Sequence, residues 1–224
     1  MNFNKIRRLT MSEEFNDKSY KDYDIFLGKF FSIESFANNL VDLKLSFFNR
    51  CDHKIYLNLM NNLNNFKSLK ILHLRGFEFE DIFTLNLADL IELSLENCIN
   101  IALDDNMCLN LKNLYLDDCS FYVPNTLLKF PKLEICDFFN LDEQRYSSII
   151  DFHSLNKIKS FSGEVCDFLN LNSQILEKVN LFSLVENSYE IELKIFEKII
   201  SLKNLKKLTF ELYYLDINDI NEVL

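Results

Sequence analysis

Apolar residues recur along the chain in one fixed spacing. The clearest copy is Leu90-x-x-Leu93-x-Leu95-x-x-Cys98, and the same pattern returns 21 residues later at positions 111–119. Apolar and polar residues alternate at the centre of each copy, which is the periodicity of a β-strand. The pattern therefore predicts a series of short strands with one buried face.

Further copies of this pattern begin at Leu40, Leu69, Phe130, Leu155, Leu176 and Leu205. The copy that begins at Leu155 is degraded, because Ser160 stands where an apolar residue belongs. Phe161 would point inward there only if the strand slipped or bulged. One additional copy is indicated at the start of the chain by Ile6-x-x-Leu9-x-Met11.

A single copy of this length has too little apolar surface to fold alone, so the copies are expected to stack into one core. Each strand would pair in parallel with the equivalent strand of the next copy. Apolar residues at helical spacing predict helices near 53–66, 142–153 and 189–202 in the long return segments. The short return segments have room only for a turn or an extended strand. Longer convex helices would bring the strands closer together on the concave side, so we expect a curvature that varies along the chain and is tighter at both ends than in the middle.

This arrangement resembles the leucine-rich repeat family, in an irregular, cysteine-containing form, and the resemblance is clear over residues 40–213. It implies an α/β solenoid, a curved horseshoe with a parallel sheet on its concave face and short helices and turns on its convex face. It also implies about eight repeats over 40–213, with a cap or degenerate first repeat at 1–39 and a C-terminal cap helix at 214–224.

The charge and the cysteines limit the classes of partner and the location. The formal net charge is −10, which disfavours general binding of nucleic acid or of an anionic membrane. No apolar run approaches the roughly 20 residues of a membrane helix. Six cysteines without a C-x-x-C pair predict buried free thiols, with Cys98 and Cys119 side by side in the core. Such thiols favour an intracellular protein, cytoplasmic or nuclear.

The sequence offers little for catalysis. Its three histidines, His53, His73 and His153, lie in different copies and match no metal-binding or catalytic-triad spacing. Three glycines are too few for phosphate-binding loops. We therefore expect no enzymatic activity, no cofactor and no metal site.

The concave face of the sheet is the expected binding surface. Its middle is predicted to be acidic, its C-terminal half to be basic, and exposed aromatic residues to lie between them. The exposed positions of the fifth copy would be Lys132, Glu134 and Cys136. The candidate partner-binding residues are Arg75, Glu92, Glu96, Tyr115, Asp117, Glu134, Lys157, Lys159, Phe161, Lys178 and Phe182.

The leading hypothesis is a protein-interaction module that holds a protein or peptide with a basic segment on the concave face. The alternative is a structural subunit of a larger assembly, bound through its ends and its convex side. A third hypothesis, which the irregular repeat lengths disfavour, is a regulator of a GTPase acting through Arg75. The fourth hypothesis is that the concave face is exposed to solvent and binds no partner. The sequence does not determine the oligomeric state.

Overall fold

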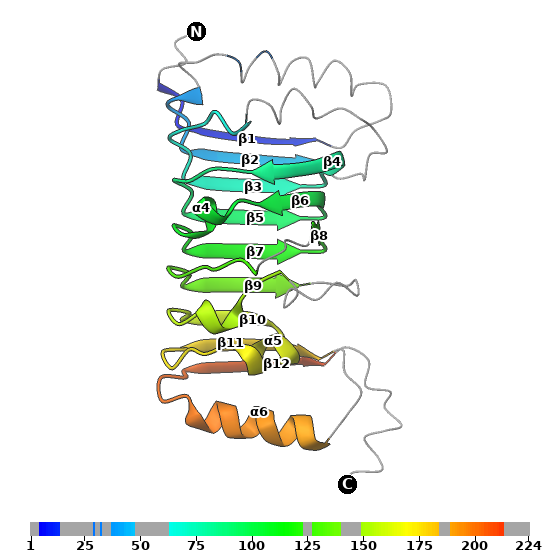
Figure 1. The fold of residues 1–224 in the computed structure, drawn as a ribbon, viewed down its shortest axis with the longest axis vertical. Helices are drawn as coiled ribbons and strands as arrows, with labels where there is room; N and C mark the ends of the chain where they lie inside the picture. Colours follow the sequence, from blue (N-terminus) through cyan, green and yellow to red (C-terminus); the bar gives the residue numbers. More distant parts are fainter. Residues whose placement is uncertain are drawn as a thin grey trace.

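The computed structural model describes residues 5–13, 29, 32, 37–47, 63–122, 127–139, 149–183 and 189–212. Within these ranges the chain forms one long parallel sheet, one small parallel sheet and a few helices. The architecture is therefore α/β, with all elements in a single stack (Figure 1).

The long sheet has nine described strands, and their order in the sheet follows their order in the chain (Figure 1). The strands are β1 (Arg8–Glu13), β2 (Asp42–Phe47), β3 (Ile71–Arg75), β5 (Glu92–Glu96), β7 (Asn113–Asp117), β9 (Ile135–Phe139), β10 (Ser160–Glu164), β11 (Lys178–Ser183) and β12 (Lys207–Leu212). Neighbouring strands are parallel throughout. Parallel neighbours require a crossover, and each return segment supplies it.

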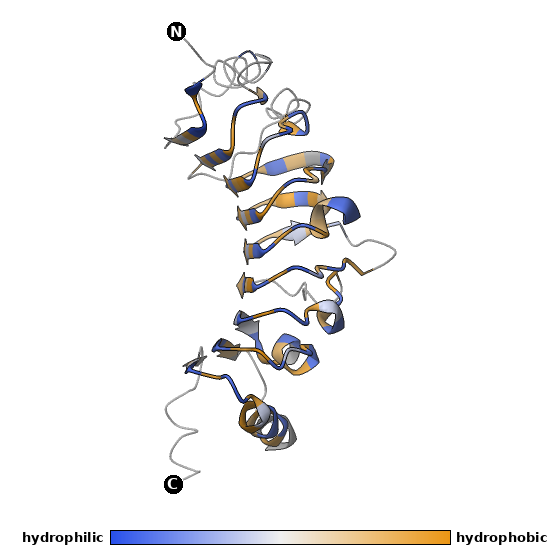
Figure 2. Cartoon of the chain, turned by 90° about the vertical axis from the view of Figure 1, so that its left-hand side faces the viewer, coloured by the Kyte–Doolittle hydropathy of each residue, from blue (hydrophilic) through white to orange (hydrophobic). Residues whose placement is uncertain are grey.

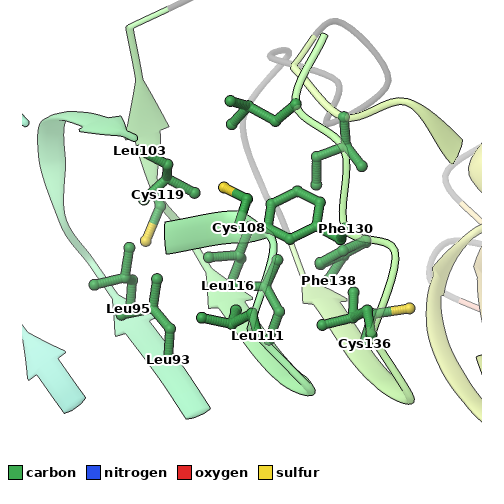
Figure 3. Close-up of a cluster of buried hydrophobic side chains, with 14 of the residues drawn as sticks. Leu93, Leu95, Leu103, Cys108, Leu111, Leu116, Cys119, Phe130, Cys136 and Phe138 are labelled. Carbon is green, nitrogen blue, oxygen red and sulfur yellow. The ribbon is translucent and has the colours of Figure 1, made fainter. Parts of the chain in front are cut away.

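The register explains the core. Leu93 on β5 pairs with Leu72 on one side and with Leu114 on the other. The same registers align Leu95 with Leu74 and Leu116. These six leucines are buried, so the two inner positions of the pattern form continuous apolar rows, part of which Figure 3 shows.

The copy indicated at Ile6 is confirmed as a strand of the same sheet. Strand β1 pairs with β2 so that Leu9 lies beside Leu43 and Met11 beside Leu45. The N-terminal residues 5–13 thus follow the same rule as the clear copies. Most of the remaining cap region, like the predicted cap helix at 214–224, lies outside the described residues.

The predicted register of the fifth and sixth copies is wrong by three residues. Cys136, and not Leu133, pairs with Leu114, and Phe161 pairs with Cys136. Leu133 and Ile158 are buried, but they take the first position of the pattern, just before each strand. In the fifth copy the apolar spacing is satisfied in both registers, whereas in the sixth it is interrupted in both, by Ser160 in the predicted register and by Gly163 in the observed one. In each copy the strand pairs in the later register.

Gly163 lies where the other copies have a large apolar side chain, and the ring of Phe161 fills the space. A Cβ atom on Gly163 would lie 2.8 Å from the Phe161 Cζ atom. The Phe161 ring packs between Phe138 and Phe168, at centroid distances of 6.4 and 6.1 Å. One large aromatic side chain therefore covers two core positions of β10.

The short return segments run as extended strands, as predicted. Strands β4 (Glu78–Leu85), β6 (Ile99–Leu103) and β8 (Ser120–Phe121) pair in parallel as the small sheet. The turns into them repeat as well. Gly76, Asn97 and Asp118 follow β3, β5 and β7 with positive φ, and each N–H donates to the last carbonyl of the next strand in the long sheet. Glycine, asparagine and aspartate are the residues that tolerate this backbone conformation.

The described helices are short except for the last. They are α4 (Asp105–Cys108), the 3-10 helix η3 (Phe152–Ser154), α5 (Val165–Asn170) and α6 (Tyr189–Ser201). Helix α6 confirms the helix predicted at 189–202. Most of the helix predicted at 53–66 lies outside the described residues, and the described part of 142–153 ends in η3. Helices α4 and α5 were not predicted. None of the described helices has the length and apolar character needed to cross a membrane.

The helices and the small sheet lie behind the long sheet, and its other face, here named the open face, is not covered by them (Figure 2). The stack bends so that the open face lies on the inside of the bend. Its middle is nearly straight in this view, and the bend is concentrated toward the two ends.

Four cysteines are buried as free thiols, as predicted: Cys98, Cys108, Cys119 and Cys136. Cys119 follows β7 at the place where Cys98 follows β5, and their thiols donate hydrogen bonds to Asp117 O and Glu96 O, at 3.2 and 3.3 Å. Burial raises the pKa of Cys108 and of Cys136. These side chains therefore pack as small apolar groups. Cys51 and the side chain of Cys166 lie outside the described residues.

Candidate functional site

The register arranges the side chains of the open face in three rows that cross the strands. The first row begins the strands from β3 to β12, with Ile71, Glu92, Asn113, Ile135, Ser160, Lys178 and Lys207. The middle row contains Lys44, His73, Ser94, Tyr115, Asp137, Ser162 and Asn180. The third row contains Ser46, Arg75, Glu96, Asp117, Phe139, Glu164 and Phe182.

Carboxylates gather on the open face of β5, β7 and β9. We name Glu92, Glu96, Asp117 and Asp137 the acidic patch. Within it, Glu96 Oε1 lies 3.1 Å from Arg75 Nη2, an ion pair between neighbouring strands of the third row. Arg75 is thus on the face, as predicted, with its guanidinium next to a carboxylate of the chain itself.

Glu92 is held by two neutral side chains. His73 Nε2 lies 3.0 Å from Glu92 Oε1, and Asn113 Nδ2 donates to Glu92 Oε2 at 2.9 Å. Burial lowers the pKa of His73, as does the nearby charge of Lys44, against the opposing effect of the Glu92 hydrogen bond. The imidazole is therefore neutral at pH 7 and donates from Nε2, so the charge of Glu92 is not cancelled by its neighbour.

Asp117 is in an unfavourable position for a carboxylate. Its pKa is raised by partial burial and by the charges of Glu96, Asp118 and Asp137, while Arg75 opposes the shift. The positive-φ turn after β7 places Asp118 directly beside it. In the described part of the chain, the Asp117 side chain has no ion pair of its own. Ionisation of Asp117 is therefore less favourable in the folded chain than in water, which lowers the free energy of unfolding.

Tyr115 lies in the middle row, on the strand that carries Asp117. Burial raises the pKa of its phenol, and the charges of Glu92 and Asp137 raise it further. The hydroxyl therefore stays protonated at physiological pH and available as a donor. An aromatic ring beside carboxylates combines apolar contact area with electrostatic attraction for a cation.

The basic half of the face is smaller than predicted. Glu134, Lys157 and Lys159 do not lie on the strands but in the segments that lead into β9 and β10. Lys159 Nζ lies 2.6 Å from Glu134 Oε2, and this bond lowers the pKa of Glu134 and raises that of Lys159. Lys178 starts β11 on the face, as predicted.

Glu134 and Lys159 belong to a charge ladder along one edge of the sheet. The residues that directly precede β7, β9, β10, β11 and β12 are Lys112, Glu134, Lys159, Glu177 and Lys206, with alternating sign. The last pair, Lys206 Nζ and Glu177 Oε2, is 2.7 Å apart. The pattern is visible in the sequence only after the strands are aligned in the correct register. These lysines neutralise carboxylates of the chain rather than forming a basic patch.

The predicted positions of two more residues are wrong. Phe161 and Cys136 are both buried in the core, as a result of the register difference described above, and neither reaches the open face. Phe182 lies on the open face but is only 8% exposed, because it packs edge-on against Phe139 with ring centroids 5.2 Å apart. Phe139 was missed in the sequence, and a register three residues later would have placed it on the face.

No group of three or more His, Cys, Asp or Glu side chains that could hold a metal ion occurs among the described residues. The chain matches no protein-family model. A search of curated proteins finds no similar sequence.

Proposed function

We propose that the protein is a leucine-rich repeat solenoid and that it acts as a non-enzymatic module for protein interaction. Support for the fold comes from the sequential parallel sheet, from the aligned leucines and from the described helices and small sheet, which lie behind one face (Figure 2). Stacked repeats of this kind create an extended concave surface, which here is the open face.

The open face is proposed to bind a protein or peptide with a basic segment. The observation that carries this proposal is the arrangement of carboxylates: strand pairing places Asp117 beside Glu96, Asp118 follows it in the chain, and Asp137 lies on the neighbouring strand β9. Partial burial and these charges raise the pKa of Asp117. A lysine or arginine of a partner would relieve this repulsion. Tyr115 and the Phe139 ring would add apolar contact on either side.

The test uses fluorescein-labelled peptides of 12 residues, one rich in arginine and lysine and one in which glutamate replaces each of those residues. Binding is followed by fluorescence anisotropy at several salt concentrations. The chain should bind the basic peptide, and binding should weaken as salt rises. The triple variant Glu96→Gln, Asp117→Asn, Asp137→Asn should lose about tenfold or more in affinity.

A matched control removes the same charge elsewhere. Asp81, Asp89 and Asp105 lie on the surface away from the open face, and all three are exposed. The variant Asp81→Asn, Asp89→Asn, Asp105→Asn should bind the basic peptide as the unchanged chain does. Equal losses in both triple variants would show a response to net charge alone, and the open face would then not be the binding site.

A structural role in a larger assembly is the second candidate. It is favoured by the exposed apolar residues at the C-terminal end of the stack, which include Phe196 and Ile200. The proposal of a GTPase regulator has less support, because Arg75 is already paired with Glu96.

A further inference from the structure

A histidine lies beside the acidic patch. Among the described residues His73 is the only histidine on the open face, where it lies between Lys44 on β2 and Ser94 on β5 in the middle row. His73 Nε2 lies 3.0 Å from Glu92 Oε1, and the two side chains are only 27% and 24% exposed. Histidine is the side chain whose charge changes most readily near neutral pH. A change in its charge would therefore act directly on a carboxylate of the acidic patch.

Charged side chains face His73 from both neighbouring strands. Burial is the largest influence on the pKa of His73 and lowers it, and the charge of Lys44 on β2 lowers it further. The hydrogen bond and the charge of Glu92 on β5 raise the pKa, as does the charge of Asp42 on β2. On β3 itself, Arg75 follows in the third row and is paired with a carboxylate of β5. The lowering influences predominate, so the imidazole is neutral at pH 7 and gains its proton in acidic solution.

The proton has a defined place on the ring. Because neutral His73 donates from Nε2 to Glu92, its Nδ1 atom carries no hydrogen. A proton added at Nδ1 leaves the hydrogen bond to Glu92 intact. The second carboxylate oxygen of Glu92 stays available to Asn113 Nδ2, which donates to it at 2.9 Å. Protonation thus replaces a neutral donor by an imidazolium beside the same carboxylate, without a rearrangement of the row.

The added charge offsets part of the acidic patch. At pH 7 Arg75 compensates the carboxylate of Glu96, whereas the two side chains that hold Glu92 are neutral. An imidazolium 3.0 Å from Glu92 would reduce the attraction of the patch for a basic segment, because part of the charge of Glu92 would already be compensated. The linkage is reciprocal, so a partner's lysine or arginine near Glu92 would oppose protonation of His73. Binding of a basic segment and uptake of a proton therefore compete.

We propose that His73 is a proton-operated switch for the open face, which binds a basic segment at neutral pH and weakens its hold on that segment in mildly acidic solution. The inference rests on the proposed function of the open face and adds the condition under which that function is exercised. It is carried by the contact between His73 and Glu92 and by the partial burial of both side chains, which limits the screening of their interaction by water and salt.

The test uses the full chain and the labelled peptide rich in arginine and lysine, which contains no histidine. Fluorescence anisotropy gives the affinity at pH 7.5 and at pH 5.0, at one ionic strength. Asp117, whose pKa is raised, also gains protons as the pH falls, so the unchanged chain is compared with the variant His73→Gln. The fall in affinity between the two pH values should be about threefold larger in the unchanged chain. His73→Lys, which is charged at both pH values, should bind about threefold more weakly than the unchanged chain at pH 7.5.

A second histidine supplies a matched control. His153 is exposed and lies on the 3-10 helix η3, not on a strand of the long sheet. His153→Gln should keep the full pH dependence of the unchanged chain. Circular dichroism and the Tm of every variant establish that it is folded.

Nuclear magnetic resonance provides a readout that needs no peptide. The imidazole signal of His73, identified by its loss in His73→Gln, follows protonation of the ring directly. Glu92→Gln should lower the midpoint of this titration, and Lys44→Gln should raise it, because each substitution removes one of the charges that act on the ring.

The outcomes separate the switch from the function that it regulates. If the peptide binds at pH 7.5 and the unchanged chain and His73→Gln have equal pH dependence, the switch is overturned and the function of the open face stands. An imidazole midpoint that neither substitution moves would also overturn the switch. Absence of peptide binding at both pH values would instead refute the proposed function, and the switch with it.

Discussion

Strands β3, β5 and β7 and strands β9 to β12 are built from the same apolar pattern, but they complete their cores differently. In the first group the spacing is 21 residues, the return segments pair as a second sheet, and leucine predominates at the inner positions of the strands, with Phe77, Phe79 and Phe121 buried behind them. In the second group the spacing varies, helices replace the small sheet, and Phe138, Phe161 and Phe168 fill the core. The pattern decides which side chains point inward, and the return segments decide how well these are covered.

The largest expected difference between the two groups is the effect of removing an inward leucine. Leu93→Ala should lower the free energy of unfolding by about 3–4 kcal/mol, because the side chain is fully buried between two strands. Leu208→Ala, at the equivalent position of β12, should cost less than about 1 kcal/mol, since that side chain is already 38% exposed. Urea unfolding measures both. Similar losses would mean that Leu208 is covered in solution.

An intermediate effect is expected where the second group departs from the pattern. Gly163→Ala should destabilise the protein by about 1–2 kcal/mol, because the new methyl group would displace the Phe161 ring, 2.8 Å away, from its packing against Phe138 and Phe168. Adding Phe161→Leu should recover part of that loss, and the double-mutant cycle measures the coupling. Additive effects of the two substitutions would contradict the proposed sharing of space.

The smallest effects concern charge, and they should have opposite signs in the two groups. Ionisation of Asp117 is unfavourable in the folded protein, so Asp117→Asn should raise the Tm at pH 7 by about 1–2 °C. The ionised form of Glu134 is favoured by Lys159, so Glu134→Gln should lower the Tm by about 1 °C or less.

The pH dependence sharpens this prediction. The raised pKa of Asp117 makes its ionisation destabilising above that pKa, so the gain from asparagine disappears as the pH falls through it. The lowered pKa of Glu134 means that its contribution is present at neutral pH and is lost as the pH falls through that lower value. Once the pH is below the lowered pKa of Glu134, both differences in Tm should vanish. Two shifts of the same sign at pH 7 would contradict the described charge distribution.

The sequence predicts the regular strands because Leu93 and Leu95 fit only one register. It fails at β10 because Ser160 interrupts one apolar spacing there and Gly163 interrupts the other. It fails at β9 because two apolar spacings overlap, one through Leu133 and Ile135 and the other through Cys136 and Phe138. The correct one is selected by hydrogen bonds to β7, a neighbour 22 residues earlier, and a local pattern does not contain that information.

The same limit applies to the acidic patch and to the basic half of the face. Glu92, Glu96 and Asp117 were placed on the face because their strands were read in the correct register. Lys159 was predicted to be available for a binding partner. Its actual partner, Glu134, lies 25 residues earlier in the chain and becomes a neighbour only through strand pairing. Which charges cancel depends on the alignment of the strands more than on composition.

The alignment of side chains in the rows of the open face does not depend on the number of residues that connect one strand to the next. Between aligned positions on successive strands the chain uses 21 residues from β5 to β7 but 29 from β11 to β12, and the side chains still meet at the same level. Insertions and deletions in the return segments are therefore free to accumulate without shifting one surface residue relative to another. Related proteins could therefore differ in the length of these segments and keep the same arrangement of side chains on the open face.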